Sequence, residues 1–319
     1  MKVSILIPIY GVERFIGQCA KSLFEQTYKD IEYVFVDDCT PDNSVKVLEE
    51  VLADYSNRQA QVKIARHEKN RGLGAARLTG MQQATGELIM FVDSDDYIAE
   101  NCVEYLVKRF VETDADIVDG AYATFSGDTI LKTTKPWHHL SNEQYLKAIL
   151  IQNTVSNNIW ARMFRRSFFD ETGVSFVEGV NLAEDYSIMG RILLTANRSC
   201  LDKVVYYYRY NDYGTFADGV SARHIESLLH AVKLVCDYIR SNDRNGKFST
   251  AMDIGLLNVY SLAMKVGVEY KETERYCGKP ISFFMRSCLW LAKPRHGKLL
   301  RWIYLVIKKL YKMCVLHIH

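Results

Sequence analysis

The sequence predicts an α/β fold in which helices flank a mostly parallel sheet. Short apolar runs alternate with amphipathic segments four to five times within about the first 122 residues. Such alternation produces right-handed βαβ units, and strands that are apolar throughout are typical of a sheet buried on both faces. Three of the runs end in polar residues, and open α/β sheets bind their ligands at the carboxyl ends of their strands.

The apolar runs and their periodicity define the elements of this first part of the chain. Strands are predicted at Lys2–Ile9, Ile31–Val36, Val62–Ala65, Leu88–Val92 and Asp116–Tyr122. Helices are predicted at Val12–Gln26, Val45–Tyr55, Asn70–Ala84 and Glu100–Glu112, where apolar side chains recur every three or four residues. Gly86 is expected to end the third helix, since a glycine commonly follows the last helical turn.

The regular alternation stops near Ala123. Residues 123–140 predict a loop or a hairpin, and residues 142–152 predict a helix. Another helix is expected to carry Glu184 and Asp185 in its first turn, because the apolar residues around them share one helical face. A strand is predicted at residues 204–210, and the chain beyond about residue 223 is helical in pattern.

The composition indicates a cytoplasmic protein with a sizeable core. Of the 319 residues, 48% are hydrophobic, which excludes wholesale disorder. The eight cysteines are scattered without a C-x-x-C pair, and Cys19 and Cys102 occupy apolar helical positions, as reduced cysteines do. The N-terminus is predicted to be a strand rather than a signal peptide, and no run of roughly 18 apolar residues predicts a spanning helix.

The formal net charge of +2 conceals an asymmetry along the chain. No acidic residue follows Glu274, whereas ten basic residues do: Arg275, Lys279, Arg286, Lys293, Arg295, Lys298, Arg301, Lys308, Lys309 and Lys312. The other 30 of the 40 Lys and Arg accompany all 38 acidic residues. An acidic body therefore carries a basic tail, and the two are expected to meet different partners.

The tail also predicts an amphipathic helix over residues 298–313. Its apolar stripe consists of Leu299, Trp302, Ile303, Val306, Leu310 and Met313. A helix of this composition can bind an anionic membrane surface. It can equally pack on the rest of the chain or on a second subunit, and both alternatives stay open. Nucleic acid binding is disfavoured because the sequence contains no recognised module for it.

Two carboxylates, Asp93 and Asp95, follow the apolar run Leu88–Val92 directly. In extended backbone they would point to the same side, and two convergent carboxylates suit a hard divalent cation and, through it, a diphosphate. The alternative is an Asp-rich turn before the next helix. Asp37–Asp38 and Pro8–Tyr10 follow two other strands, so four carboxylates and a tyrosine are expected on one rim of the sheet.

Five motifs in a fixed order resemble those of the family 2 glycosyltransferases over residues 1 to about 210. They are Val-Ser-Ile-Leu-Ile-Pro-Ile-Tyr from residue 3, Val-Asp-Asp-Cys-Thr-Pro-Asp-Asn-Ser from residue 36, Asn-Arg-Gly-Leu-Gly-Ala-Ala-Arg from residue 70, Phe-Val-Asp-Ser-Asp-Asp from residue 91 and Ala-Glu-Asp-Tyr from residue 183. The resemblance implies a GT-A fold, which is a Rossmann-like sheet flanked by helices, here with a helical C-terminal extension. It also implies sugar transfer with inversion of the anomeric centre.

The sequence departs from the usual family pattern at two places near the expected nucleotide. Cys39 stands where the family usually has Gly, and Thr40–Pro41 stands where it has Ser-Thr. Leu78 follows Arg77, where Asn is usual. These departures concern the choice of donor rather than the class of protein.

The resemblance implies that the acidic motif binds a metal. Asp95 would be the principal ligand of Mn²⁺ or Mg²⁺, which would act as a Lewis acid on the donor diphosphate. Asp93 would contact the ribose or support the metal through water, and Ser94 lies between them in the same site.

The resemblance also implies residues for the nucleotide. Asp38 would accept a hydrogen bond from the base, and Tyr10 would stack near the base beside Pro8. Asn70 and Arg77 would complete the nucleotide pocket.

Further residues would serve the diphosphate and the acceptor. Arg209 and Ser221 would approach the diphosphate from the far side, where a guanidinium suits phosphate oxygens. Asp185 would be the catalytic base and Glu184 would orient the acceptor or hold Asp185. Without the resemblance, two acidic residues in a first helical turn would simply favour the positive end of the helix.

The expected function is that of a metal-dependent inverting glycosyltransferase. It would move a sugar from a nucleoside diphosphate sugar, with a UDP-sugar favoured, to an acceptor hydroxyl in polysaccharide or glycolipid biosynthesis. Residues 1–122 would form the nucleotide-binding half and residues 123–222 the acceptor-binding half of one domain, with residues 223–319 as a helical basic region. The expected location is cytoplasmic, peripheral on the inner face of the cell membrane if the tail binds lipid, and a homo-oligomer stays open.

Two other functions were weighed against this one. A sugar nucleotidyltransferase needs a Gly-rich loop with Arg after the first strand, where this sequence has Pro8-Ile-Tyr-Gly-Val. A non-catalytic scaffold would have lost the acidic motif or the Glu184–Asp185 pair, and both are present.

Overall fold

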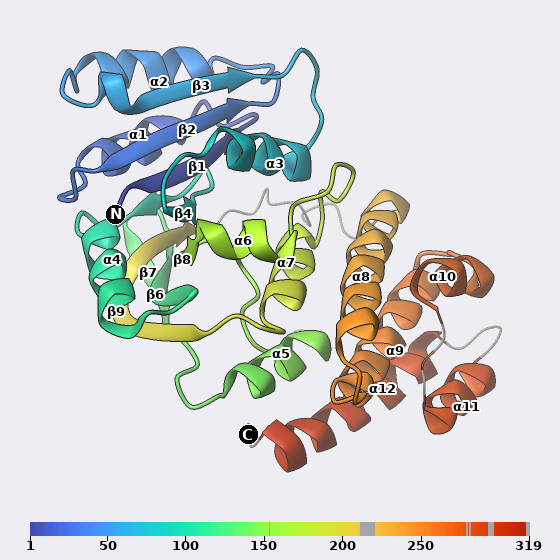
Figure 1. The fold of residues 1–319 in the computed structure, drawn as a ribbon. Coiled ribbons are helices and arrows are strands. Elements are labelled where there is room, and N and C mark those ends of the chain that lie inside the picture. Colours follow the sequence, from blue (N-terminus) through green and yellow to red (C-terminus); the bar gives the residue numbers. More distant parts are fainter. Residues whose placement is uncertain (153, 211–220, 279, 281, 293–296, 317–319) are drawn as a thin grey trace. The chain divides into compact units, whose positions relative to one another are not determined.

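The computed structural model describes residues 1–152, 154–210, 221–278, 280, 282–292 and 297–316 (Figure 1). The chain divides into two compact units, and each unit is assembled from three chain segments. The first unit comprises Met1–His138, Ile159–Asn181 and Ala196–Gly214, and the second comprises His139–Asn158, Leu182–Thr195 and Thr215–His319. The expected boundary between residues 1–222 and 223–319 stays a prediction.

The first unit is built on a sheet with nine strands in the described part of the chain. They are β1 (Val3–Ile9), β2 (Ile31–Asp37), β3 (Val62–Arg66), β4 (Leu88–Phe91), β5 (Tyr97–Ile98), β6 (Ile117–Ser126), β7 (Thr129–Thr134), β8 (Arg162–Arg165) and β9 (Arg198–Arg209). Their order is β3-β2-β1-β4-β8-β6-β9-β5, and β7 pairs with β6. Strands β3, β2, β1 and β4 are parallel neighbours, β8 is antiparallel to β4 and β6, and β6 is parallel to β9. The predicted α/β architecture is confirmed.

Helices cover both faces of the parallel strands. They are α1 (Ile16–Phe24), α2 (Ser44–Ala53), α3 (Leu73–Gln83), α4 (Cys102–Thr113), α6 (Arg166–Thr172) and the 3-10 turn η1 (Gln59–Gln61). Successive side chains of a strand point to opposite faces. Ile5 and Ile7 of β1 therefore pack into one core with α1 and α4, whereas Leu6 lies against Gly80 of α3 on the other face.

Several boundaries differ from the prediction for identifiable reasons. Helix α1 begins at Ile16 rather than Val12, because Phe15, with a φ of −120° and a ψ of −32°, lies outside the helical range. Helix α3 ends at Gln83, and its C-terminal cap is Ala84. The prediction that Gly86 ends this helix is therefore wrong.

The second half of the sheet was only partly predicted. Residues 123–140 contain a hairpin, in which β6 and β7 are joined at Gly127 with a φ of +55°. Strand β8 was not predicted, because a charged residue such as Arg162 is not expected in a buried strand. The Arg162 guanidinium is nevertheless buried, and its Nε lies 2.7 Å from Asp119 Oδ1. Strand β9 begins at Arg198 rather than near residue 204, and its pairing with β6 is irregular in between.

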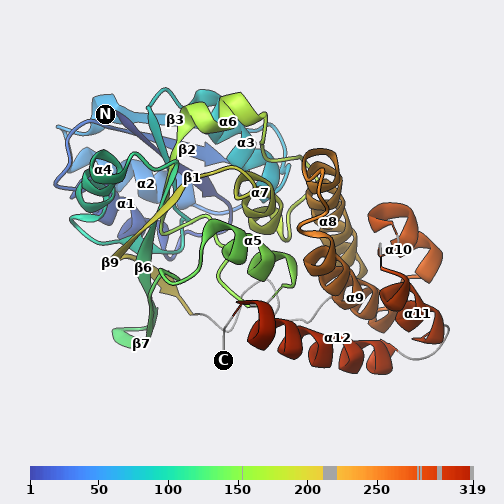
Figure 2. The ribbon, with the colours of Figure 1, turned by 60° about the horizontal axis from the view of Figure 1, so that its bottom comes forward.

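The second unit is helical in its described residues. Its helices are α5 (Asn142–Leu150), α7 (Glu184–Ile192), α8 (Ala222–Asn242), α9 (Ser249–Lys265), α10 (Tyr270–Cys277), α11 (Phe283–Ala292) and α12 (Gly297–Tyr311), followed by the π-helical turn η2 (Lys312–Leu316). Helix α9 is central, since most of its side chains are buried and it contacts α5, α8, α10, α11 and α12 (Figure 2). Among the described residues, no helix is long and apolar enough to cross a membrane.

A buried carboxylate, Glu32 of β2, ties the start of the parallel strands together. It is 3% exposed and accepts hydrogen bonds from Lys2 at 2.9 Å, from Lys63 at 3.1 Å, and from Ser4 and Thr85. Burial alone would raise the pKa of Glu32, but the hydrogen bonds from Ser4, Lys2 and Thr85 outweigh it and hold the pKa well below its ordinary value. The ionised side chain therefore stabilises the fold.

Replacing Glu32 by Gln is expected to lower the free energy of unfolding by about 2–3 kcal/mol at neutral pH, because an amide cannot accept from all of these donors. Since the folded pKa is depressed, this stabilisation is fully present above the unfolded pKa of 4.5 and is lost as the pH falls further. Urea unfolding of the wild type and of the Glu32→Gln variant, from neutral pH to below pH 4.5, measures this difference in the free energy of unfolding.

Glu49→Gln is the matched control, since Glu49 is 54% exposed and pairs with Arg66 at the surface. It is expected to cost less than about 0.5 kcal/mol. A Glu32→Gln effect as small as this, or one that does not shrink at acid pH, would contradict the role of Glu32.

Candidate active site

The loops that follow β1, β2 and β4 meet at one edge of the sheet, as the sequence predicted. The three strands are adjacent and parallel, with Ile9 of β1 beside Asp37 of β2 and Leu6 beside Phe91 of β4. Tyr10 follows β1 and is 51% exposed on this rim. The rim therefore combines an accessible aromatic ring with the expected carboxylates.

Side chains of the second loop fix the first loop. The amide of Gly11 donates to Thr40 Oγ1 at 2.8 Å, and the amides of Val12 and Glu13 donate to Ser44 and Asp42 at 3.0 Å. Asp42 also accepts from Thr40 and Ser44, so its carboxylate is occupied in holding the two loops together.

The acidic motif after β4 is a tight turn. Strand β4 ends at Phe91, and the amide of Asp96 donates to the carbonyl of Asp93 at 3.1 Å. The expectation that Asp93 and Asp95 share a side because the backbone is extended is therefore wrong. What places their carboxylates is the turn and the contacts that hold it, and Ser94 within it is 5% exposed.

Strand β9 pins this turn from behind. The hydroxyl of Tyr206 accepts from the amide of Asp93 at 3.1 Å and donates to Asp96 Oδ2 at 2.8 Å. The amide of Arg209 donates to Asp96 Oδ1 at 2.6 Å. Burial raises the pKa of the Tyr206 hydroxyl, so that it stays a donor. Asp96, at 1% exposed, thus fixes the turn from inside.

Arg209 reaches the same turn with its side chain. Its Nε donates to the carbonyl of Asp95 at 2.7 Å, and its Nη2 donates to Gln18 of α1. The guanidinium lies between two rings, 4.8 Å from the centroid of Phe15 and 4.6 Å from that of Phe125. This sandwich holds a permanent positive charge beside the acidic turn.

Arg77 supplies a second positive charge. Its guanidinium is buried and donates to Asp93 Oδ1 at 2.7 Å. Arg77 was expected in the nucleotide pocket, and here it orients the carboxylate of Asp93, which is 25% exposed.

Asp38 organises the segment before α3. Its carboxylate accepts from the amides of Arg71 at 2.8 Å and Gly72 at 2.7 Å, and it lies 2.6 Å from His67 Nδ1. Its side chain is 3% exposed, whereas Asn70 is exposed. The contact expected between Asp38 and a nucleotide base stays a prediction, and its contacts here make it a positioning residue.

The glycines of the Arg-Gly-Leu-Gly segment allow residues 177–181 to pack against α3. A Cβ at Gly72, whose φ is +86°, would lie 2.3 Å from the Asn181 side chain, and one at Gly74 would lie 2.5 Å from the carbonyl of Val180. Arg71 binds Glu178 through two hydrogen bonds of 2.8 and 3.1 Å. This motif therefore secures a packing contact, which the sequence did not reveal.

The acidic turn is electrostatically unfavourable as it stands. Burial first, and then the neighbouring Asp93, raises the pKa of Asp95 to about 6. Burial and the charges of Asp95 and Asp93 raise the pKa of Asp96 well above its ordinary range. Crowded, partly desolvated carboxylates of this kind gain most from a divalent cation.

The residues fit a cation that is shared with a ligand. Within the described ranges, no group of three or more His, Cys, Asp or Glu side chains is arranged to hold a metal by protein ligands alone. Mg²⁺ is commonly held by one or two carboxylates together with phosphate oxygens, and Asp93 and Asp95 offer such a pair.

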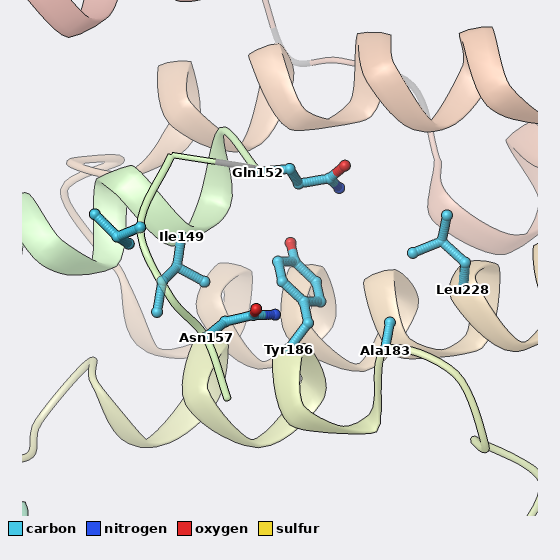
Figure 3. Close-up of a pocket in the computed structure, with 7 residues that line it drawn as sticks. Ile149, Gln152, Asn157, Ala183, Tyr186 and Leu228 are labelled. Carbon is cyan, nitrogen blue, oxygen red and sulfur yellow. The ribbon is translucent and has the colours of Figure 1, made fainter. Parts of the chain in front are cut away.

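Glu184 and Asp185 occupy the first turn of α7 in the second unit, as predicted. Glu184 is buried and Asp185 is partly exposed. A cavity of about 180 Å³ lies beside this turn and is lined by Ile149, Gln152, Val155, Asn157, Ala183, Tyr186 and Leu228 (Figure 3). Tyr186 rises from α7 with its hydroxyl toward Gln152. The structure thus places a small, partly polar cavity next to the expected catalytic pair.

Some residues of the rim escaped the sequence analysis. Asp96 and Tyr206 fix the acidic turn, and Gln18 and Phe15 hold Arg209. Only Asp96 gave a signal, as the third carboxylate of its motif. Ser221 lies in the second unit, where it caps α8. Trp160 stacks on Tyr206, with 4.8 Å between the ring centroids, and so packs against the residue that holds the turn.

Comparison with known proteins bears on this arrangement. A family model described as glycosyl transferase family 2 matches residues 4–173, which is more than half of the chain. EpsJ of Bacillus subtilis, an uncharacterized glycosyltransferase, is 33% identical over 217 residues, covering 66% of this chain and 61% of EpsJ. The chain thus spans less than two thirds of that relative.

Solved structures show the same fold. TarS of Staphylococcus aureus, a poly(ribitol-phosphate) beta-N-acetylglucosaminyltransferase, is 29% identical over 216 residues, 65% of this chain and 35% of TarS. The structure of TarS residues 1–349 with UDP-GlcNAc matches 97% of this chain and 92% of that chain at 20% identity, with a TM-score of 0.64. The mannosyltransferase PcManGT of Pyrobaculum calidifontis, solved with GDP-Man and Mn²⁺, matches with a TM-score of 0.53 at 14% identity, over 98% of this chain and 87% of that chain.

The parallel sheet with its acidic rim is that of a glycosyltransferase of the GT-A type, and the helical C-terminal part is shared with the TarS structure. The chain belongs to glycosyl transferase family 2. The family expected from the five motifs is confirmed, while the roles of individual residues stay predictions.

Cys39 allows a test of the first departure from the family pattern. It is exposed and has a φ of +56°, a conformation that costs an L-residue about 1 kcal/mol and costs glycine little. Cys39→Gly is expected to raise the free energy of unfolding by about 0.5–1 kcal/mol, measured by denaturant unfolding. Cys39→Ser removes the same thiol and keeps the penalty; equal stability of the two variants would show that the backbone is not strained there.

Tyr206→Phe tests the pin behind the acidic turn. Loss of the hydroxyl leaves the Asp93 amide and the Asp96 carboxylate without this partner, so the free energy of unfolding is expected to fall by about 1–3 kcal/mol. Thermal unfolding measures it against Tyr208→Phe, since Tyr208 lies on the same face of β9 and is 39% exposed. Equal effects of the two substitutions would contradict the role of Tyr206.

Proposed function

We propose that this protein transfers a sugar from a nucleoside diphosphate sugar to an acceptor hydroxyl, with a divalent cation and with inversion of the anomeric centre. The observation that carries the proposal is the turn that holds Asp93 and Asp95 at the carboxyl end of β4, pinned by Tyr206 and flanked by two buried or stacked guanidinium groups. Breaking the bond to a diphosphate requires that its charge be neutralised, and this rim concentrates the groups for that purpose.

Asp95, with support from Asp93, would hold Mn²⁺ or Mg²⁺ against the diphosphate; the cation would supply Lewis-acid stabilisation of the leaving group. Arg77 keeps Asp93 oriented, and the Arg209 guanidinium adds a positive charge close to Asp95. Ser94, buried within the turn, keeps the backbone compact around them.

The nucleotide would lie over the ends of β1 and β2. Tyr10 offers an exposed ring next to Pro8, and Asp38 fixes the loop from which Asn70 projects. A UDP-sugar is favoured because TarS, which matches this chain in both sequence and fold, was solved with UDP-GlcNAc. The Mn²⁺ in the PcManGT structure supports a metal-dependent reaction.

Asp185 would take the proton of the acceptor hydroxyl, and Glu184 would position it. An inverting reaction is a single displacement, so one carboxylate suffices, and general-base assistance contributes about 10²–10⁴-fold. The acceptor would be a glycan or a lipid-linked sugar in polysaccharide biosynthesis, since TarS is named as a transferase that modifies a polymer.

The cellular location follows from the same chemistry. Eight cysteines free of disulfides suit a reducing compartment, where nucleotide sugars are also the donors at hand. We therefore propose a cytoplasmic enzyme, peripheral on the inner membrane face if its acceptor is lipid-linked.

The test is release of sugar from a panel of nucleotide sugars, with Mn²⁺ and with chelator. Asp95→Ala is expected to lower turnover by about 10²-fold or more, because Lewis-acid stabilisation is worth several kcal/mol. Asp185→Asn is expected to lower transfer by about 10²–10⁴-fold. Asp54→Ala, at an exposed position after α2, is the matched control and should be silent.

Release that survives both chelation and Asp95→Ala would overturn the metal role. If no donor is turned over, calorimetry with UDP decides: binding that depends on Mn²⁺ and Asp95 points to a missing acceptor, and absence of binding contradicts the proposal.

A further inference from the structure

Helix α12 has two apolar faces, and only one of them packs inside the second unit. Leu300 and Tyr304 are fully buried, and the Tyr304 hydroxyl donates to the carbonyl of Ile151 at 3.0 Å. This inner face packs on α9. The inward packing that the sequence left open as an alternative is therefore real, but it uses residues outside the predicted stripe.

The predicted stripe itself faces solvent. Its exposed members are Leu299, Trp302, Val306, Leu310 and Met313, with Trp302 62% and Leu310 56% exposed, while Ile303 is half-buried at its edge. Their spacing of three and four residues aligns them along one side of the helix. A contiguous apolar stripe in water on a folded protein generally marks an interaction surface.

Lysines run along one flank of this stripe. At about 100° per residue, Lys298 and Lys309 fall next to Trp302 and on the side away from Ile303. Lys312 follows directly in η2. Lys298 and Lys309 are exposed and Lys312 is partly exposed. No acidic residue occurs in the sequence after Glu274, so nothing in α11, α12 or η2 neutralises them.

The neighbouring helix extends the same chemistry. Helix α11 contacts α12 (Figure 2). On α11, Phe283 is 84%, Phe284 61% and Trp290 71% exposed. Arg286 is also exposed on it. Helix α11 therefore also exposes aromatic rings and a cation, and like α12 it has no carboxylate.

These properties discriminate between the occupants of such a surface. A second copy of the chain would bring two cationic surfaces face to face, which like charges oppose. A bilayer with anionic headgroups satisfies both requirements, since the apolar side chains enter the acyl boundary while lysines stay at the phosphates.

We propose that the exposed face of α12 and η2, formed by Leu299, Trp302, Val306, Leu310 and Met313 with the lysine flank, binds the surface of an anionic lipid bilayer. The helix lies in the interface and does not cross it. Binding of this kind is independent of the donor and of the metal, so it stands or falls separately from the proposed sugar transfer.

Co-sedimentation of the full-length chain with lipid vesicles tests the proposal. Vesicles of phosphatidylcholine containing phosphatidylglycerol are compared with vesicles of phosphatidylcholine alone, at low and high salt. The protein is expected to bind the anionic vesicles at low salt and to be released by salt, because exposed charges are screened. Equal binding to both compositions, or binding to neither, overturns the proposal.

Point substitutions locate the surface better than deletion of the helix, which would also strip Tyr304 from the core. The double substitution Trp302→Ser and Leu310→Ser is expected to lower the partition coefficient about tenfold or more. The triple substitution Lys298→Gln, Lys309→Gln and Lys312→Gln is expected to lower it about 100-fold, since each basic residue contributes about fivefold near an anionic surface.

Matched controls come from the first unit. Val111 of α4 is 72% exposed, and the side chain of Lys46 of α2 is 73% exposed, so Val111→Ser and Lys46→Gln should bind as wild type does. The proposal is overturned if the double serine variant and the triple glutamine variant both bind vesicles as the wild type does. It is also overturned if light scattering without vesicles shows a dimer that the Trp302 and Leu310 substitutions dissociate. Thermal unfolding shows whether each variant is folded. If the double serine variant is unfolded, the triple glutamine variant, which changes only surface charge, still decides the test.

Discussion

The candidate site depends on one arrangement: a strand that pins an acidic turn from behind. Tyr206 and Arg209 of β9 hold the backbone and the innermost carboxylate of a turn that lies more than a hundred residues earlier in the chain. Without these contacts, mutual repulsion would spread the carboxylates and solvent would compete for them. The rim exists as a site because the sheet brings β9 to the end of this turn.

The same arrangement explains why the protein tolerates an unfavourable cluster. The carboxyls of Asp95 and Asp96 are harder to ionise than usual, because burial and the neighbouring carboxylates raise their pKa values by more than the contacts with Arg209 lower them. Glu32, at the opposite ends of the strands, is fully compensated by its donors. The carboxylate that stabilises the fold and the carboxylates of the candidate site thus lie at opposite ends of the same parallel strands.

The parallel core could be predicted because its strands are buried on both faces and therefore apolar throughout, and the rim followed from their shared direction. What the sequence could not reveal depends on distant contacts. Strand β8 was hidden because Arg162 is charged yet paired with Asp119. The contacts of Asp38 with the amides of Arg71 and Gly72, and the packing of residues 177–181 against Gly72 and Gly74, join segments that no local sequence pattern connects. The apolar stripe of α12 was predicted, but the sequence did not reveal that it faces solvent. The helix packs inward through Leu300 and Tyr304 instead, and the periodic pattern does not tell which of two apolar faces is buried.

Each compact unit is assembled from three separate chain segments, and this has a consequence for synthesis on the ribosome. The sheet of the first unit lacks β9 until Arg209 has emerged, so the acidic turn is synthesised long before Tyr206 and Arg209, which hold it in place. In the second unit, α5 and α7, which contain the buried residues Ile149, Leu150 and Ile188, emerge before α8 and α9, the helices that they contact. The nascent chain therefore exposes the edge of the sheet that pairs with β9, and the apolar faces of α5 and α7, until the later segments have been made.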